Sequence, residues 1–76
     1  MLKVFIERAY IERKSLSDRD LERLRASLLD QVQRYEHSIR NYSPQDMEKH
    51  GRPFLARLIQ KVTDVDATIA ARANGS

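Results

Sequence analysis

The 76-residue chain has no cysteine and no tryptophan, and it has only two glycines and two prolines. Without cysteine, the chain cannot form a disulfide framework, a thiolate zinc site or a cysteine nucleophile. Its two glycines lie 24 residues apart, which leaves no glycine-rich loop to hold a phosphate group. These absences exclude several common kinds of catalytic, metal-binding and disulfide-rich domain.

Long apolar runs are also missing. No segment approaches the ~20 apolar residues that a membrane-spanning helix needs. The apolar segment 2–6 contains Lys3, is too short for the core of a signal peptide, and is followed by no small-residue cleavage site. Together with the absence of cysteine, this pattern predicts a cytoplasmic protein.

Charge of one sign does not dominate either. Fourteen Lys and Arg stand against eleven Asp and Glu, which gives a formal charge of +3 at pH 7. Charged residues of mixed sign make up 33% of the chain and indicate a solvated surface. Ten of the fourteen bases are arginine, which pairs readily with carboxylate or phosphate. Nucleic-acid binding by this Arg-rich surface is therefore an alternative function.

The most regular pattern lies in segment 17–42, where it predicts one long amphipathic helix. Its apolar stripe recurs at helical spacing and is interrupted by Arg25; the stripe consists of Leu21, Leu24, Leu28, Val32, Tyr35, Ile39 and Tyr42. Ser17 precedes Asp20 by three residues, as in a capping box, and Leu16 precedes the cap as in a hydrophobic staple. These signals place the start of the helix at Ser17.

A second helix start is predicted at Ser43. Pro44 follows at the first helical position, where its missing N–H has no cost, and Asp46 completes a second capping box. Because residues that precede a proline avoid helical geometry, the long helix should end near Tyr42. Such a short connection favours antiparallel neighbouring helices.

The remaining helical pattern is interrupted by Gly51 and Pro53. An interior proline breaks or kinks a helix, so we expect a short helix at 44–50 and another at 53–73, with one kinked helix as the alternative. Residues 74–76 are expected to form a frayed tail. The apolar stripe of the last helix consists of Leu55, Leu58, Val62, Val65 and Ile69.

The first segment allows two interpretations. Its apolar residues share a face at helical spacing, which predicts a helix over residues 2–14, although the alternation of Leu2, Val4 and Ile6 also suits a strand. A lone strand has no visible partner, so the helix is favoured. Segment 1–14 then serves either as a third core helix or as an arm that docks on a partner.

The sequence offers few candidate metal ligands or catalytic residues. His37 and His50 would lie near each other across the turn, but neither belongs to a paired metal-binding motif, and two exposed histidines explain them better. The carboxylates belong to helix starts and charge-balanced faces rather than to a dry pocket. We expect no enzymatic activity, no cofactor and no metal site.

The sequence therefore predicts an all-α protein with a single domain, 1–76. An antiparallel helical hairpin over residues 15–73 would join the N-terminal helix in a bundle-like homodimer. The predicted function is non-catalytic protein–protein interaction through apolar helix faces, as in a small regulator, adaptor or chaperone, with itself or another protein as the partner. The candidate partner-binding residues, which the hairpin needs least, are Phe5, Ile6, Tyr10 and Arg13.

Overall fold

The computed structural model describes the backbone of residues 2–75 and the side chains of residues 6–75. The all-α prediction is confirmed, with no strand among residues 2–75. The elements, in order, are α1 (Leu2–Ile11), the 3₁₀ turn η1 (Arg13–Ser15), α2 (Asp18–Ser38), α3 (Pro44–Asp46), the π-helical turn η2 (Met47–Gly51) and α4 (Arg52–Gly75).

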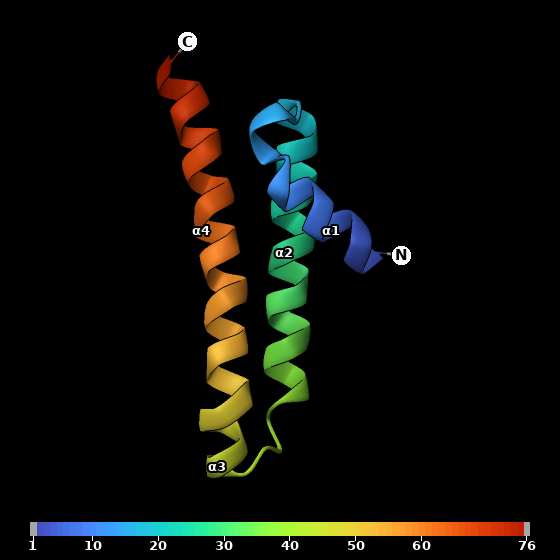
Figure 1. The fold of residues 1–76 in the computed structure, drawn as a ribbon, viewed down its shortest axis with the longest axis vertical. Coiled ribbons are helices and arrows are strands. Elements are labelled where there is room, and N and C mark those ends of the chain that lie inside the picture. Colours follow the sequence, from blue (N-terminus) through green and yellow to red (C-terminus); the bar gives the residue numbers. More distant parts are fainter. Residues whose placement is uncertain (1, 76) are drawn as a thin grey trace.

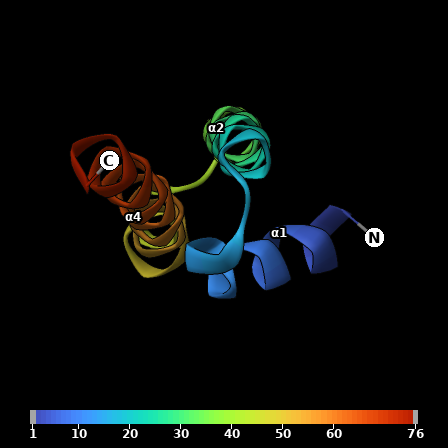
Figure 2. The same cartoon turned by 90° about the horizontal axis from the view of Figure 1, so that it is seen from above.

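Helices α2 and α4 lie side by side and run in opposite directions (Figure 1). Helix α1 lies toward the end where α2 begins (Figure 1), and the view from above shows it on one face of the pair (Figure 2). The molecule is elongated and thin, with extents of 47 × 26 × 16 Å. Because α1 is short and crosses the pair, it covers only part of the face on which it lies.

The apolar core fills the junction of α1, α2 and α4. Leu21, Leu24 and Leu28 of α2 are fully buried there, together with Val65 of α4. Helix α1 contributes Ile6 and Ala9, and the partly buried residues packed around this cluster are Tyr10, Leu16, Val62 and Ile69. Of the predicted apolar stripes, Leu21, Leu24 and Leu28 of α2 and Val62, Val65 and Ile69 of α4 belong to this core.

The two predicted helix starts are confirmed. The Asp20 N–H donates to the Ser17 hydroxyl oxygen at 3.1 Å, and the Asp46 N–H donates to the Ser43 hydroxyl oxygen at 3.2 Å. Pro44 occupies the first turn of α3 as expected. Each cap satisfies a backbone N–H that the helix itself leaves without a partner.

Helix α2 ends at Ser38, so the prediction that it continues to Tyr42 is wrong. Residues 39–42 instead form successive tight turns, in which the Arg40 N–H donates to the His37 carbonyl oxygen and the Tyr42 N–H to that of Ile39. Packed helices have axes about 8–10 Å apart. A connection of one residue could not cross that distance, and the turns at 39–42 supply the missing length.

The predicted break between residues 50 and 53 is also wrong, and the alternative of one kinked helix is closer to the structure. The chain remains helical from Pro44 to Gly75 through η2. In η2 the Arg52 N–H donates to the carbonyl oxygen of Met47, five residues back. Proline lacks the N–H that would continue an α-helix. The wider turn directly before Pro53 rearranges the hydrogen bonds there, so the chain continues without unwinding.

Both predicted end segments need correction. Helix α1 ends at Ile11 rather than at residue 14, and η1 then turns the chain toward the Ser17 cap. Helix α4 includes Asn74 and Gly75, which were expected in a frayed tail. Alanines 70, 71 and 73 precede them, and alanine has the highest helix propensity of all residues.

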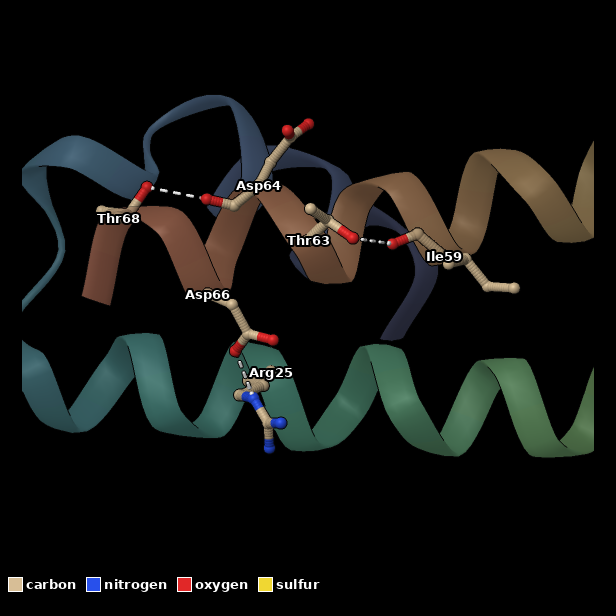
Figure 3. Close-up of polar contacts among 6 residues, drawn as sticks. All are labelled: Arg25, Ile59, Thr63, Asp64, Asp66 and Thr68. Atoms are coloured by element: carbon tan, nitrogen blue, oxygen red, sulfur yellow. Dashed lines mark hydrogen bonds and ion pairs between the residues drawn. The ribbon is translucent and has the colours of Figure 1, made fainter. Parts of the chain in front are cut away.

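The charged interruption of the α2 stripe is explained by a contact with α4. Arg25 lies at the edge of the contact between the helices, and its Nε donates to Asp66 Oδ1 at 2.5 Å (Figure 3). Both side chains are a little under half exposed, and exposed pairs of this kind contribute about 0.2–1 kcal/mol. The pair fixes the relative position of α2 and α4 more than it stabilises the fold.

Candidate protein–protein interface

An apolar groove lies beside α1, on the part of the α2–α4 face that α1 leaves uncovered. The groove has a volume of about 440 Å³. Helix α2 supplies Tyr35 and a mainly polar rim, α4 supplies Phe54 and Leu58, and α1 closes one end with Ile6. The remaining lining residues are Ser27, Asp30, Gln31, Arg34 and Ser38. We refer to this feature as the α1-side groove.

Two aromatic rings in tilted contact form the most exposed apolar part of the groove. The ring centroids of Tyr35 and Phe54 are 4.6 Å apart, with an angle of 42° between the ring planes. Phe54 remains 44% exposed. The Tyr35 hydroxyl donates to the backbone carbonyl oxygen of His50 at 3.2 Å, and burial, followed by the neighbouring Tyr42, raises the pKa of this phenol. The hydrogen bond therefore holds the neutral Tyr35 side chain in place, and its ring contacts Phe54.

The α2 rim of the groove carries charges of both signs. Arg34 Nε lies 2.9 Å from Asp30 Oδ2, one helical turn away, and both side chains are well exposed. Ser38 is also committed within the helix, because its hydroxyl donates to the Tyr35 carbonyl oxygen. An apolar floor beside a polar rim is the usual composition of a protein–protein contact.

The structure places the predicted partner-binding residues in different environments. The side chain of Phe5 lies outside the described side chains. Ile6 is 4% exposed, belongs to the core and also borders the α1-side groove. Tyr10 and Arg13 are partly buried, and Tyr10 packs against the core. Ile6 and Tyr10 therefore contribute to the packing of the fold itself, contrary to the expectation that the hairpin needs them least. Their role in partner binding stays a prediction.

A polar contact fastens α1 to α4 at Tyr10. The Tyr10 hydroxyl donates to Asp64 Oδ2 at 2.5 Å, and the Gln60 amide donates to Asp64 Oδ1 at 3.0 Å. The guanidinium of Arg13 lies over the Tyr10 ring at 4.6 Å, and the ammonium of Lys61 lies 5.5 Å from the ring centroid. The Tyr10 ring thus contacts two cationic side chains, while its hydroxyl donates a hydrogen bond to a carboxylate.

This contact shifts the pKa of both hydrogen-bonding groups. The hydrogen bond from Tyr10, followed by that from Gln60, lowers the pKa of Asp64. The same bond to Asp64, followed by burial, raises the pKa of the Tyr10 phenol. The arrangement therefore favours a neutral phenol that donates to an ionised carboxylate.

Replacing Tyr10 with phenylalanine should lower the melting temperature by a pH-dependent amount. A carboxyl whose pKa is lowered by folding stabilises the fold above its ordinary pKa, and this contribution disappears as the pH falls. A phenol whose pKa is raised by folding stabilises the fold below its ordinary pKa, and this contribution disappears as the pH rises. The difference between wild type and Tyr10→Phe should therefore be largest between the two ordinary values, 3.8 and 10.0, and shrink outside them.

Thermal melts followed by circular dichroism across this pH range would measure the difference. Tyr42→Phe is the matched control, because Tyr42 is 40% exposed. A Tyr10→Phe difference that is constant with pH, or no larger than that of Tyr42→Phe, would contradict the assigned hydrogen bond.

Histidines and acidic residues do not assemble into a reactive cluster in the described part of the chain. Among residues 2–75, no three His, Asp or Glu side chains gather as potential metal ligands. His37 Nδ1 lies 3.5 Å from the Arg40 guanidinium, whereas the backbone of His50 accepts from Tyr35.

Several arginines are already paired within the fold. Arg25 pairs with Asp66 and Arg34 with Asp30. The Arg72 guanidinium lies 3.0 Å from Asp18 and also donates to the Lys14 carbonyl oxygen. These acidic neighbours reduce the positive potential that the Arg-rich surface would present to phosphates.

Helical spacing predicts that Tyr35 belongs to the core, and it does not single out Phe54 as an exposed aromatic residue. Phe54 lies next to Leu55, one position off the predicted stripe, and this was the signal available for an exposed aromatic residue. That Tyr35 lies at the margin of the core depends on where α1 crosses the other helices. Spacing along a single helix does not contain this information.

Fold and groove together define a small all-α protein with a partly covered helix pair, and none of its helices within residues 2–75 is long and apolar enough to cross a membrane. Comparison with protein-family models, characterised proteins and solved structures finds no match for the chain.

Proposed function

We propose that this protein is a non-catalytic protein–protein interaction module, such as a small regulator, adaptor or chaperone, which binds its partner in the α1-side groove. The observation that carries the proposal is the exposed Phe54 ring, which packs against Tyr35 in an apolar groove beside α1. Exposed aromatic residues in apolar grooves are typical anchors of helix-in-groove binding.

The partner in this proposal is an apolar helix face of a second copy of this chain or of another protein. Helices α2 and α4 act as an antiparallel hairpin that presents the groove, and a partner helix would complete a bundle-like core. That the protein works in the cytoplasm stays a prediction, which rests on the absence of cysteine, of a signal-peptide pattern and of a long apolar run in the sequence. The nucleic-acid alternative has less support, because Arg25, Arg34 and Arg72 have carboxylate neighbours.

Photo-crosslinking at the groove tests the proposal. Phe54 would be replaced by benzoylphenylalanine in the full chain, and the expressing cells irradiated. Ala56 is the matched control position, since it is exposed and lies about 200° around α4 from Phe54. Protein adducts are expected from position 54 and not from position 56. Equal adducts at both positions, or none at position 54, would contradict binding in the groove.

A further inference from the structure

A single copy of this chain exposes more surface than a compact protein of its mass. Its accessible surface is 5962 Å² for 8.9 kDa. Folded monomers of this mass expose about 4,800 Å², so the excess is about 1,100 Å². The Cα radius of gyration is 14.1 Å, compared with about 11 Å for a compact domain of this length.

The excess surface matches the area that a dimer interface requires. A standard interface buries about 800 Å² on each partner, which is less than the excess on this chain. The thinnest extent of the molecule is 16 Å, whereas one helix with its side chains is about 10–12 Å across. The excess surface of the chain is therefore large enough to accommodate an interface with a second copy.

The charges on the groove rim are suited to a two-fold axis. In a two-fold symmetric dimer, whenever residue i of one copy meets residue j of the other, j also meets i. Asp30 and Arg34 lie one turn apart on the exposed edge of α2 and carry opposite charges. If two α2 helices pair antiparallel about an axis between these residues, each Asp30 approaches an Arg34 of the other copy. No like charges then face each other.

We propose that the occupant of the α1-side groove is a second copy of this chain, related by a two-fold axis that passes beside α2. This proposal rests on the proposed function and specifies its partner. The second copy covers the exposed Phe54 ring and the apolar floor at Leu58. Asp30 and Arg34 set the register of the two copies through reciprocal ion pairs.

Sedimentation equilibrium of the full chain and of three charge variants tests this proposal. The full chain should have twice the 8.9 kDa mass of one chain. Asp30→Arg and Arg34→Asp each place like charges across the axis twice, and each should raise the dimer dissociation constant at least roughly tenfold. The double variant Asp30→Arg/Arg34→Asp restores opposite charges across the axis and should recover the dimer. Circular dichroism of every variant checks that the helices remain folded.

Each other outcome has a defined meaning. A full chain that stays monomeric at about 1 mM would overturn the second-copy proposal. Adducts from position 54 to other proteins would in that case leave the proposed function standing with a different partner, whereas no such adducts would remove both. A dimer insensitive to the single reversals, or not recovered in the double variant, would contradict this interface.

Discussion

Replacing Leu28 with alanine should lower the free energy of unfolding by about 2–5 kcal/mol. Leu28 is fully buried between α1, α2 and α4, and its truncation removes apolar contacts and leaves a cavity among neighbours on three helices. A domain of this length has a total stability of only about 4–11 kcal/mol. From the middle of this range, a loss of that size would leave the variant with roughly one third to three quarters of its stability.

Urea unfolding followed by circular dichroism would measure this loss. Because dimerisation would couple unfolding to protein concentration, wild type and variant must be compared at matched concentrations. Leu29→Ala is the control, since Leu29 is the next residue of α2 and remains partly exposed. A loss below about 1 kcal/mol at Leu28, or an equal loss at Leu29, would contradict the assigned core.

Replacing Gly51 with valine should destabilise the protein by about 1–3 kcal/mol. Gly51 is buried where η2 passes the end of α2. A Cβ atom added there would lie 2.6 Å from Met47 Sδ, 3.5 Å from Ile39 Cδ1 and 3.6 Å from Tyr42 Cδ2. The flexible thioether of Met47 can move aside, but the two methyl groups of valine would then press on Ile39 and Tyr42.

Thermal and urea unfolding of Gly51→Val and Gly75→Val would separate packing from backbone effects. A Cβ added at Gly75 has no atom within 4 Å, so this substitution reports how a helical glycine responds without any clash. Gly51→Ala should cost less than Gly51→Val, because alanine gains up to about 1 kcal/mol of helix propensity to offset the displacement of Met47. A Gly51→Val protein as stable as Gly75→Val would show that η2 does not pack tightly on α2.

The parts of the fold that the sequence predicts correctly are those decided by local chemistry. The caps at Ser17 and Ser43 depend on residues within three positions of each other, and both are present in the structure. The buried faces of α2 and α4 follow from helical spacing, because the same period that groups apolar residues in sequence groups them on one side of a helix.

The errors arise where distant parts of the chain decide the outcome. Proline predicts a break at residue 53, but the chain continues as a helix that passes close to Ile39 and Tyr42 through η2. The end of α2 depends on the distance that the chain must cross to reach α3. The groove likewise depends on the crossing of α1, so no local pattern could single out Phe54 as its exposed anchor.

The connection at residues 39–43 also has a consequence for the order in which the structure forms. The contact between Tyr35 and His50 closes a loop of 15 residues, whereas the contacts Arg25–Asp66 and Arg72–Asp18 span 41 and 54 residues. Forming the last of these directly costs about 1 kcal/mol more loop-closure entropy than forming the first. Contacts between α2 and α4 should therefore form first at the connected ends of the two helices, so that Tyr35 and Phe54 come together early in folding.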